Sequence, residues 1–266
     1  MIRALTLRQL RHQRALFAAV WLGLAALEWL LVVVVARIEM GPGIRALFEQ
    51  FLPPAIRVLF GSLLGSASFG GLVAFGFTHP AGLVAAIGFI VVVATLPAGE
   101  RESGILELIL SRPVPRVRYL AAVVLLLVVA AVVLPLGLLA GAALGLQQVD
   151  NPDELSWTRY VYASTGLTCL LLAIGGYTLY FATGASRRGR AVALAVGWTV
   201  TLLWIEILAQ LWAPLERVRW ISPFHYYDPM GYVVAAGAPL YHPAVLLGVF
   251  VVATAAAFRR FHRQDL

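Results

Sequence analysis

Long apolar runs, separated by short charged segments, constrain this chain more than any other feature of its sequence. Residues 119–146 carry no charged side chain, and residues 15–36 and 191–212 carry one each. An α-helix crosses the hydrocarbon core of a bilayer, about 30 Å thick, with about 20 such residues. Only 12% of the 266 residues are charged and 61% are hydrophobic, whereas soluble domains carry about a quarter charged residues. The chain is therefore predicted to be an integral membrane protein.

The apolar runs predict an all-α membrane protein with six transmembrane helices, in a single transmembrane domain over residues 1–266. Residues 62–78 fit either the first half of a kinked second span or an outer loop. Residues 213–243, polar and then broken by Pro and Gly, are predicted to form an outer-side, re-entrant segment before a short sixth span. An amphipathic pattern at residues 44–51 predicts an outer-face helix on the membrane. The six predicted spans cover residues 15–36, 80–97, 119–146, 159–185, 191–212 and 244–258.

All 20 basic side chains are arginine, and their distribution predicts the orientation of the spans. With both termini in the cytoplasm, 14 arginines lie on the cytoplasmic side and 6 on the outer side, as the positive-inside rule requires. The same rule accounts for the net charge of +7, so we expect no nucleic-acid binding. Residues 1–14 carry four arginines within an arc of about 140° on a helix. This predicts an interfacial helix at the cytoplasmic surface, with a solvated basic tail as the alternative.

The most charged segment between two spans is residues 98–118, which we call the charged segment. It holds three Glu and four Arg. Polar side chains gather on one side of a helical wheel and Ile and Leu on the other, which predicts a short amphipathic helix from Ser103, as N-cap, to Ser111. Pro113 and Pro115 would end this helix. Such a helix offers a partner an apolar ridge edged by carboxylates, or it merely joins two spans.

The charged segment resembles a known motif. Its run Glu-Arg-Glu-Ser-Gly-Ile-Leu-Glu at residues 100–107 is followed by Pro-Val-Pro-Arg at residues 113–116. Together they are similar to the segment between spans two and three in permeases of the type-2 ABC exporter family, with Ile105 and Pro115 as departures. The run Ile-Ser-Pro-Phe-His-Tyr-Tyr-Asp-Pro at residues 221–229 and the ending Arg-Gln-Asp-Leu resemble the branch of multicopper-enzyme-maturation, or nitrous-oxide-reductase-maturation, permeases.

The resemblance implies a permease subunit in the plasma membrane of a bacterium or archaeon. Two copies, or one copy and a related permease, would pair. Each charged segment would then act as a coupling helix in a groove of a separate ABC ATPase subunit, present in two copies. The chain has no Lys and so no Gly-x-x-x-x-Gly-Lys-Ser/Thr phosphate loop. We therefore expect no cofactor in this chain and place ATP and Mg²⁺ in the ATPase. The implied ATPase-coupling residues are Glu100, Glu102, Gly104, Leu106, Glu107, Leu108, Ile109 and Pro113.

Two functions fit this resemblance. The first is ATP-driven export of a substrate. The alternative is a mechanical complex that passes motion to a periplasmic accessory protein during copper-enzyme maturation, without solute transport. An ion-coupled secondary transporter is less favoured, because the sequence shows no inverted repeat and no chain of buried carboxylates.

Glu28 and Glu206 are the only acidic residues well inside predicted spans, where a charge costs about 2.5 to 3.5 kcal/mol on insertion scales. In type-2 exporters similar spans line the dimer centre. The two residues are therefore candidates for a dimer interface or a translocation path. The alternative is that they reach outer-surface water or pair locally with Arg37, Arg57 or Arg217.

The remaining polar residues give weaker signals. His225 and Asp228 are metal-ligand types, but a single pair three residues apart favours an aromatic interfacial anchor closed by Pro229. Cys169 is the one cysteine, so no disulfide forms within the chain. We find no Ser-His-Asp arrangement and no carboxylate dyad in the sequence. We therefore predict no catalytic residues and no enzyme activity.

Overall fold

The fold is a bundle of long helices. The computed structural model of the chain describes residues 2–37, 69–111, 115–148, 157–234, 239 and 241–263, and these contain helices and turns without a strand. Five of the described helices are long and apolar enough to cross a membrane, and there are six if one bent helix pair counts as a single span. The all-α class is confirmed for the described residues, with five or six candidate membrane spans.

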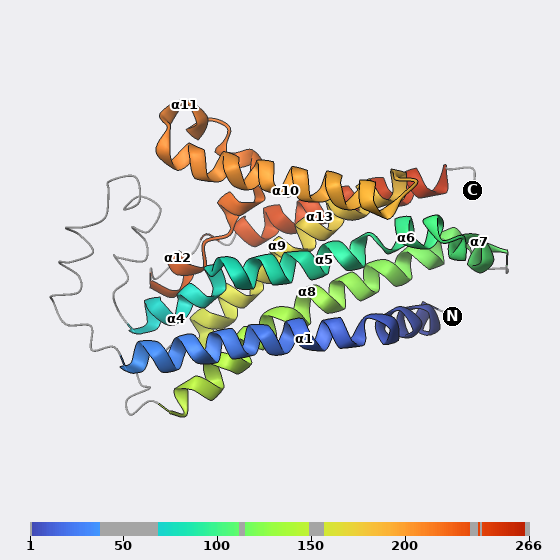
Figure 1. The fold of residues 1–266 in the computed structure, drawn as a ribbon. Helices are drawn as coiled ribbons and strands as arrows, with labels where there is room; N and C mark the ends of the chain where they lie inside the picture. The colour runs from blue at the N-terminus through green and yellow to red at the C-terminus, as the bar shows by residue number, and fades with distance from the viewer. Residues whose placement is uncertain are drawn as a thin grey trace.

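Five long helices make up most of the bundle (Figure 1). They correspond to the first, third, fourth, fifth and sixth predicted spans. Each forms around a long apolar run, and a helix needs about 20 apolar residues to cross a membrane. Their bounds are α1, Ile2–Arg37; α8, Arg116–Leu146; α9, Trp157–Gly184; α10, Arg188–Leu211; and α13, Tyr241–His262.

Shorter helices occupy the second predicted span, the residues before it, the charged segment, and the region between α10 and α13. The predicted loop or half-span at residues 62–78 contains a helix over its described part. The predicted outer helix at residues 44–51 lies outside the described residues. The short helices are α4, Phe69–Thr78; α5, Pro80–Ala94; α6, Leu96–Glu102; α7, Ile105–Leu110; α11, Ala213–Glu216; η2, Arg219–Ile221; η3, Pro223–Tyr226; and α12, Pro229–Val234.

The two terminal helices are longer than the apolar runs that predict them. The basic residues 2–14 continue into the first span without a break, as the first turns of α1, and Thr6 Oγ1 donates a hydrogen bond to Ala122 O of α8 at 3.3 Å. The predicted sixth span, residues 244–258, is too short: α13 has 22 residues. Its polar ends add helical turns that an apolar count leaves out, so a short last span gives no reason for a re-entrant segment before it.

The second predicted span is bent rather than straight. α5 and α6 meet at an angle of 49°. At the bend, Thr95 Oγ1 donates a hydrogen bond to Val91 O at 2.7 Å, and Pro97 in the first turn of α6 has no N–H to continue the ladder of α5. α6 therefore turns away from α5 and carries the charged segment out of the apolar part of the bundle.

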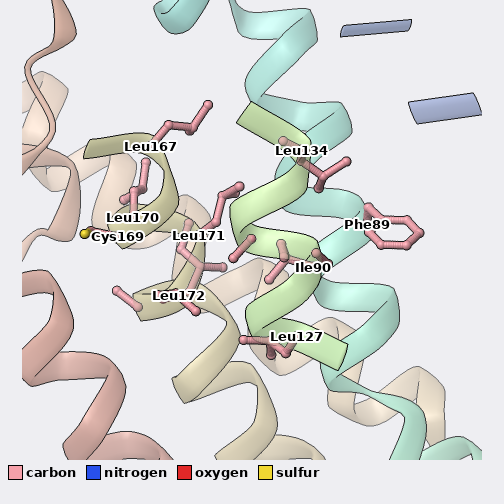
Figure 2. Close-up of a cluster of buried hydrophobic side chains, with 14 of the residues drawn as sticks. Phe89, Ile90, Leu127, Leu134, Leu167, Cys169, Leu170, Leu171 and Leu172 are labelled. Atoms are coloured by element: carbon pink, nitrogen blue, oxygen red, sulfur yellow. The ribbon is translucent and has the colours of Figure 1, made fainter. Parts of the chain in front are cut away.

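The core of the bundle lies around α9. In its most apolar stretch 78% of the residues are buried, against 22% in α1 and in α13. Figure 2 shows Ile90 of α5, Leu127 of α8 and Leu171 of α9 within one cluster of buried side chains. α9 is therefore shielded by its neighbours, whereas α1, α10 and α13 keep broad apolar faces for lipid or another protein.

α1 packs along a glycine face of α8. A Cβ atom added to Gly137 would lie 2.9 Å from Trp21 O, and one added to Gly145 would lie 2.6 Å from Val32 Cβ. One added to Gly141 would overlap the carbonyl of Ala25. Small residues let helix backbones approach closely in a membrane, so this stripe fixes α1 against α8.

Both described ends of the chain lie at one end of the bundle, together with α6 and α7 (Figure 1). The Tyr119 ring at the start of α8 stacks on Phe261 near the end of α13, with 5.9 Å between ring centroids. The first turns of α8 and the last turns of α13 therefore pack together at this end of the bundle.

Candidate functional site: the charged segment and two buried carboxylates

The charged segment forms two short helices around a glycine turn. Gly104 has a φ of 72°, in the left-handed region, where a residue with a Cβ costs about 1–2 kcal/mol. The sequence predicts Ser103 as the N-cap of a single helix, and this prediction is wrong. Its Oγ donates to Gly99 O at 3.0 Å at the end of α6, and α7 begins only after Gly104. Gly104 thus interrupts the predicted helix and changes the direction of its second half.

Two glutamates of the charged segment bind other helices of the same chain. Glu100 Oε2 accepts a hydrogen bond from the Tyr119 hydroxyl of α8 at 2.6 Å, and its Oε1 lies 3.8 Å from Arg8 Nη2 of α1. Glu102 Oε2 accepts from the backbone N–H of Arg188, the first residue of α10, at 2.9 Å. These predicted coupling residues therefore fasten α6 to α1, α8 and α10.

Arg101 fastens the same segment to α9, a contact that the sequence reasoning missed. Its Nη1 donates to Thr183 O at 3.2 Å and to Ala185 O at 3.0 Å. The last carbonyls of a helix have no partner within the helix, so the end of α9 offers acceptors to a guanidinium. These acceptors lie more than 80 residues away in the sequence. The only sequence signal for this contact was the position of Arg101 between two glutamates of the family motif.

The predicted apolar ridge of the charged segment is divided between the bundle and the outside. Leu106 has no exposed surface, and Ile109 packs against the core. Leu108 is 70% exposed, and Glu107 beside it is exposed as well. Pro113 lies outside the described residues. The surface that α7 offers to a partner is therefore centred on Glu107 and Leu108, while Leu106 holds α7 to the bundle.

Glu28 lies fully buried among α1, α4 and α8. None of its surface is exposed, and neither carboxyl oxygen has a hydrogen-bond partner in the described part of the chain. The space for its carboxyl group comes from Gly76 of α4, where an added Cβ would overlap Glu28 Oε2. Gly141 of α8 makes a similar allowance, since a Cβ there would lie 2.9 Å from Glu28 Cβ. The sequence reasoning missed both glycines, because their role depends on helix packing.

Glu206 is also buried, but one of its carboxyl oxygens has donors, while Oε2 accepts no hydrogen bond from the described residues and lies 4.0 Å from His225 Nδ1. Its Oε1 accepts from Arg219 Nη2 at 2.6 Å and Nε at 2.9 Å, and from Gln210 Nε2 at 3.0 Å. These hydrogen bonds raise the pKa of the Arg219 guanidinium, although burial acts to lower it. A local pair is therefore present, with Arg219 as partner rather than Arg217. Glu206 thus contacts the segment after α10, whereas Glu28 contacts α4 and α8.

The segment from η2 to α12 is held to the bundle by side-chain hydrogen bonds. Ser222 Oγ donates to Leu202 O of α10 at 2.9 Å, and the Tyr227 hydroxyl donates to Phe77 O of α4 at 2.6 Å. Asp228 Oδ1 accepts from the Gly231 N–H at 2.9 Å, so this carboxylate is used by the first turn of α12. The described residues contain no group of three or more His, Cys, Asp or Glu side chains that could hold a metal ion.

The helices and the charged segment together define a multi-pass helical membrane protein. A family model described as ABC-2 family transporter protein matches residues 29–266, and the chain belongs to that family. Searches of curated proteins and of solved structures found no match. The family assignment confirms the resemblance to type-2 ABC permeases, which are membrane subunits, are generally not catalytic themselves, generally work with an ABC ATPase and often dimerise. It gives no support to the maturation-permease branch.

Proposed function

We propose that this chain is the permease subunit of an ATP-driven type-2 exporter in a plasma membrane. A separate ABC ATPase subunit would bind ATP and Mg²⁺, and the charged segment would receive its motion on the cytoplasmic side. The single observation that supports this most strongly is the set of contacts of α6. Glu100, Arg101 and Glu102 reach four long helices, while Glu107 and Leu108 on the neighbouring α7 face outward.

This arrangement suits a mechanical coupling element. A push on α7 would reach α6 through the Gly104 turn. α6 would pass it to α8, α9 and α10 through charge-assisted hydrogen bonds, which are stronger than neutral ones, and to α1 through the Arg8–Glu100 ion pair. The 49° bend at Thr95 separates this unit from α5, so α6 and α7 can shift together relative to the second span. Rigid elements joined at such points are the usual hinges of conformational change.

The exposed faces of α1 and α10 support pairing of two permeases. Only 22% and 28% of their most apolar stretches are buried, and α10 exposes Trp198 and Trp204. A second copy, or a related permease, would cover part of these faces. Glu28 and Glu206 are buried within the chain rather than on these faces, so they would line a translocation path between the copies only after the helices around them move.

A mechanical complex that matures a copper enzyme is the second candidate. The observation that favours it is the residue 221–229 motif, whose Ser222 and Tyr227 tie it to α10 and α4. Motion of these helices would reach a periplasmic accessory protein without solute crossing the membrane. An adjacent reading frame for a periplasmic copper-handling protein, beside one for the ATPase, would favour this function over export.

The coupling role is tested by changing the outward face of α7. Leu106 is unsuitable, because a charged residue in its buried position would disturb the fold. With an ABC ATPase that co-purifies with the unchanged chain co-expressed, Glu107→Arg and Leu108→Asp should each reduce its co-purification about tenfold, the loss of roughly 1.4 kcal/mol, and lower the permease-stimulated ATP hydrolysis.

The matched control for this test is Glu216→Arg, the same substitution on exposed α11 at the other end of the bundle (Figure 1). It should leave both co-purification and ATP hydrolysis unchanged. If Glu107→Arg and Leu108→Asp behave like this control, the charged segment does not bind the ATPase.

A further inference from the structure

A polar cavity of about 700 Å³ lies between the first turns of α1 and the charged segment. Arg8, Arg11 and Arg188 line it, with Glu100 and Glu102. Both carboxylates already accept hydrogen bonds from the protein, from Tyr119 and from the Arg188 N–H. The three arginines and two glutamates therefore leave the cavity with a net positive charge that is not fully neutralised within the described part of the chain.

Two side chains that line this cavity have polar groups without a partner among the described residues. Arg11 has no hydrogen bond or ion pair in the described part of the chain. Gln9 is 4% exposed, and its buried Oε1 accepts no hydrogen bond from any described residue. A buried acceptor of this kind costs free energy unless a donor reaches it. The cavity thus suits a ligand that has an anionic group for Arg11 and a hydroxyl or ammonium group for Gln9.

An apolar groove of about 380 Å³ lies on the same face of α1, deeper in the bundle. Residues 19–27 of α1 and 81–85 of α5 line it with small and aliphatic side chains, including Gly23. At 1.5 Å per residue, Gly23 lies about 15 Å along the helix from Gln13 at the inner edge of the polar cavity. Half of a hydrocarbon core is also about 15 Å, so the groove lies at the depth of an acyl chain.

We propose that the polar cavity and the apolar groove together bind one resident anionic phospholipid. The phosphate binds Arg11, a headgroup hydroxyl donates to Gln9, and one acyl chain lies in the groove beside Gly23. Basic pockets between helices at the cytoplasmic side are suited to anionic headgroups. A free phosphate leaves the groove empty, and a second copy of this chain fills an apolar groove but gives the basic cavity no anion.

The bound phospholipid is a structural part of the permease and not its cargo. Its headgroup lies between α1 and α6, where Arg8 already approaches Glu100. It therefore braces the charged segment against α1. This site depends on membrane insertion of the bundle and holds whether or not an ATPase binds α7.

The headgroup half of the proposal is tested by titrating the purified full-length chain with phosphatidylglycerol or phosphatidylcholine and counting bound lipids by native mass spectrometry. We expect one phosphatidylglycerol per chain, bound about tenfold more tightly than phosphatidylcholine, and a loss of about tenfold in Arg11→Ala, the effect of one charge-assisted contact. Arg14→Ala removes an exposed arginine of the same helix that does not line the cavity, and should bind as the unchanged chain does. Equal losses in the two variants, or no preference between the lipids, would overturn the proposal.

The groove half is tested with Gly23→Leu. A Cβ atom added at Gly23 meets no atom within 4 Å, and the longer leucine side chain would extend into the groove that Gly23 lines. Gly88→Leu is the matched control, at an exposed glycine of α5 with the same free space outside the groove. Gly23→Leu should weaken phosphatidylglycerol binding at least tenfold, and Gly88→Leu should not. If Gly23→Leu keeps the lipid, the site binds only an anion. If it keeps the lipid and dissociates a permease dimer, the groove is a protein interface. Either result overturns the proposal.

Discussion

The two carboxylates inside the spans are buried to a similar extent but stabilised in opposite ways. The Glu206 side chain is 8% exposed and accepts three hydrogen bonds, two of them from Arg219. Glu28 is fully buried and accepts none among the described residues. An ionised carboxylate without a partner is too costly to bury in a membrane-spanning helix. The packing around Glu28 therefore tolerates only the neutral form, whereas Glu206 is held as half of an ion pair.

A buried acid in a span can therefore have two distinct structural roles. Glu206 joins α10 to the segment that follows it, and its position depends on Arg219. Glu28 has no hydrogen-bond partner among the described residues, and its carboxyl group fits only because Gly76 leaves space. A change that separates α4 from α1 would give Glu28 access to water or to a donor. Glu28 is thus the residue whose surroundings must change most if these helices move during transport.

The largest effect is expected from removal of the guanidinium that partners Glu206. Breaking a buried ion pair costs about 3–5 kcal/mol, and because the Arg219 side chain is 34% exposed we expect about 3 kcal/mol for Arg219→Ala. The measurement is the free energy of unfolding of the purified chain in detergent. Arg217→Ala, at an exposed neighbour, should cost less than about 0.5 kcal/mol. Equal costs would show that Glu206 does not depend on Arg219.

The sequence predicts the contacts of a buried carboxylate only when its partners lie close to it in the sequence. The spans were predictable, because the length of an apolar run is a local property, and a nearby arginine partner was one of the alternatives for Glu206. Arg219 rather than Arg217 fills that role because the turn after α10 decides which side chain returns. Gly76 and Gly141 lie far from Glu28 in the sequence, so only packing reveals them.

The charged segment shows the same limit. Its amphipathic pattern predicted one helix with an apolar ridge, and α7 forms within that range, but its apolar side chains are divided between the bundle and the outside. A helical wheel does not tell which apolar side chains face the same chain, so Leu106 and Leu108 were placed together although one is buried and the other is exposed. The contacts of Arg101 with the end of α9 were equally invisible, because carbonyl acceptors carry no sequence signal.

A smaller effect is expected when the space for Glu28 is filled. Gly76→Ala places a methyl group where the carboxyl group of Glu28 lies, and such overpacking costs about 2 kcal/mol. In the Glu28→Ala background the same substitution should cost less than about 0.5 kcal/mol, so the two changes should couple by about 1.5 kcal/mol in a double-mutant cycle of unfolding free energies. Gly88→Ala, at a glycine with free space around it, should be neutral or stabilising by up to about 1 kcal/mol. Additive costs at residues 76 and 28 would mean that the two do not share this space.

The smallest effect, and the sharpest form of the comparison, comes from the same isosteric change at both carboxylates. Glu206→Gln removes the charge that Arg219 binds but keeps the shape, and the loss of a charge-assisted hydrogen bond should cost about 1–2 kcal/mol. Glu28→Gln replaces one neutral group with another of nearly equal size, so the free energy of unfolding should change by less than about 0.5 kcal/mol. Both are measured in detergent at neutral pH. If Glu28→Gln costs as much as Glu206→Gln, the Glu28 carboxylate is charged and has a partner, and the contrast between the two residues is wrong.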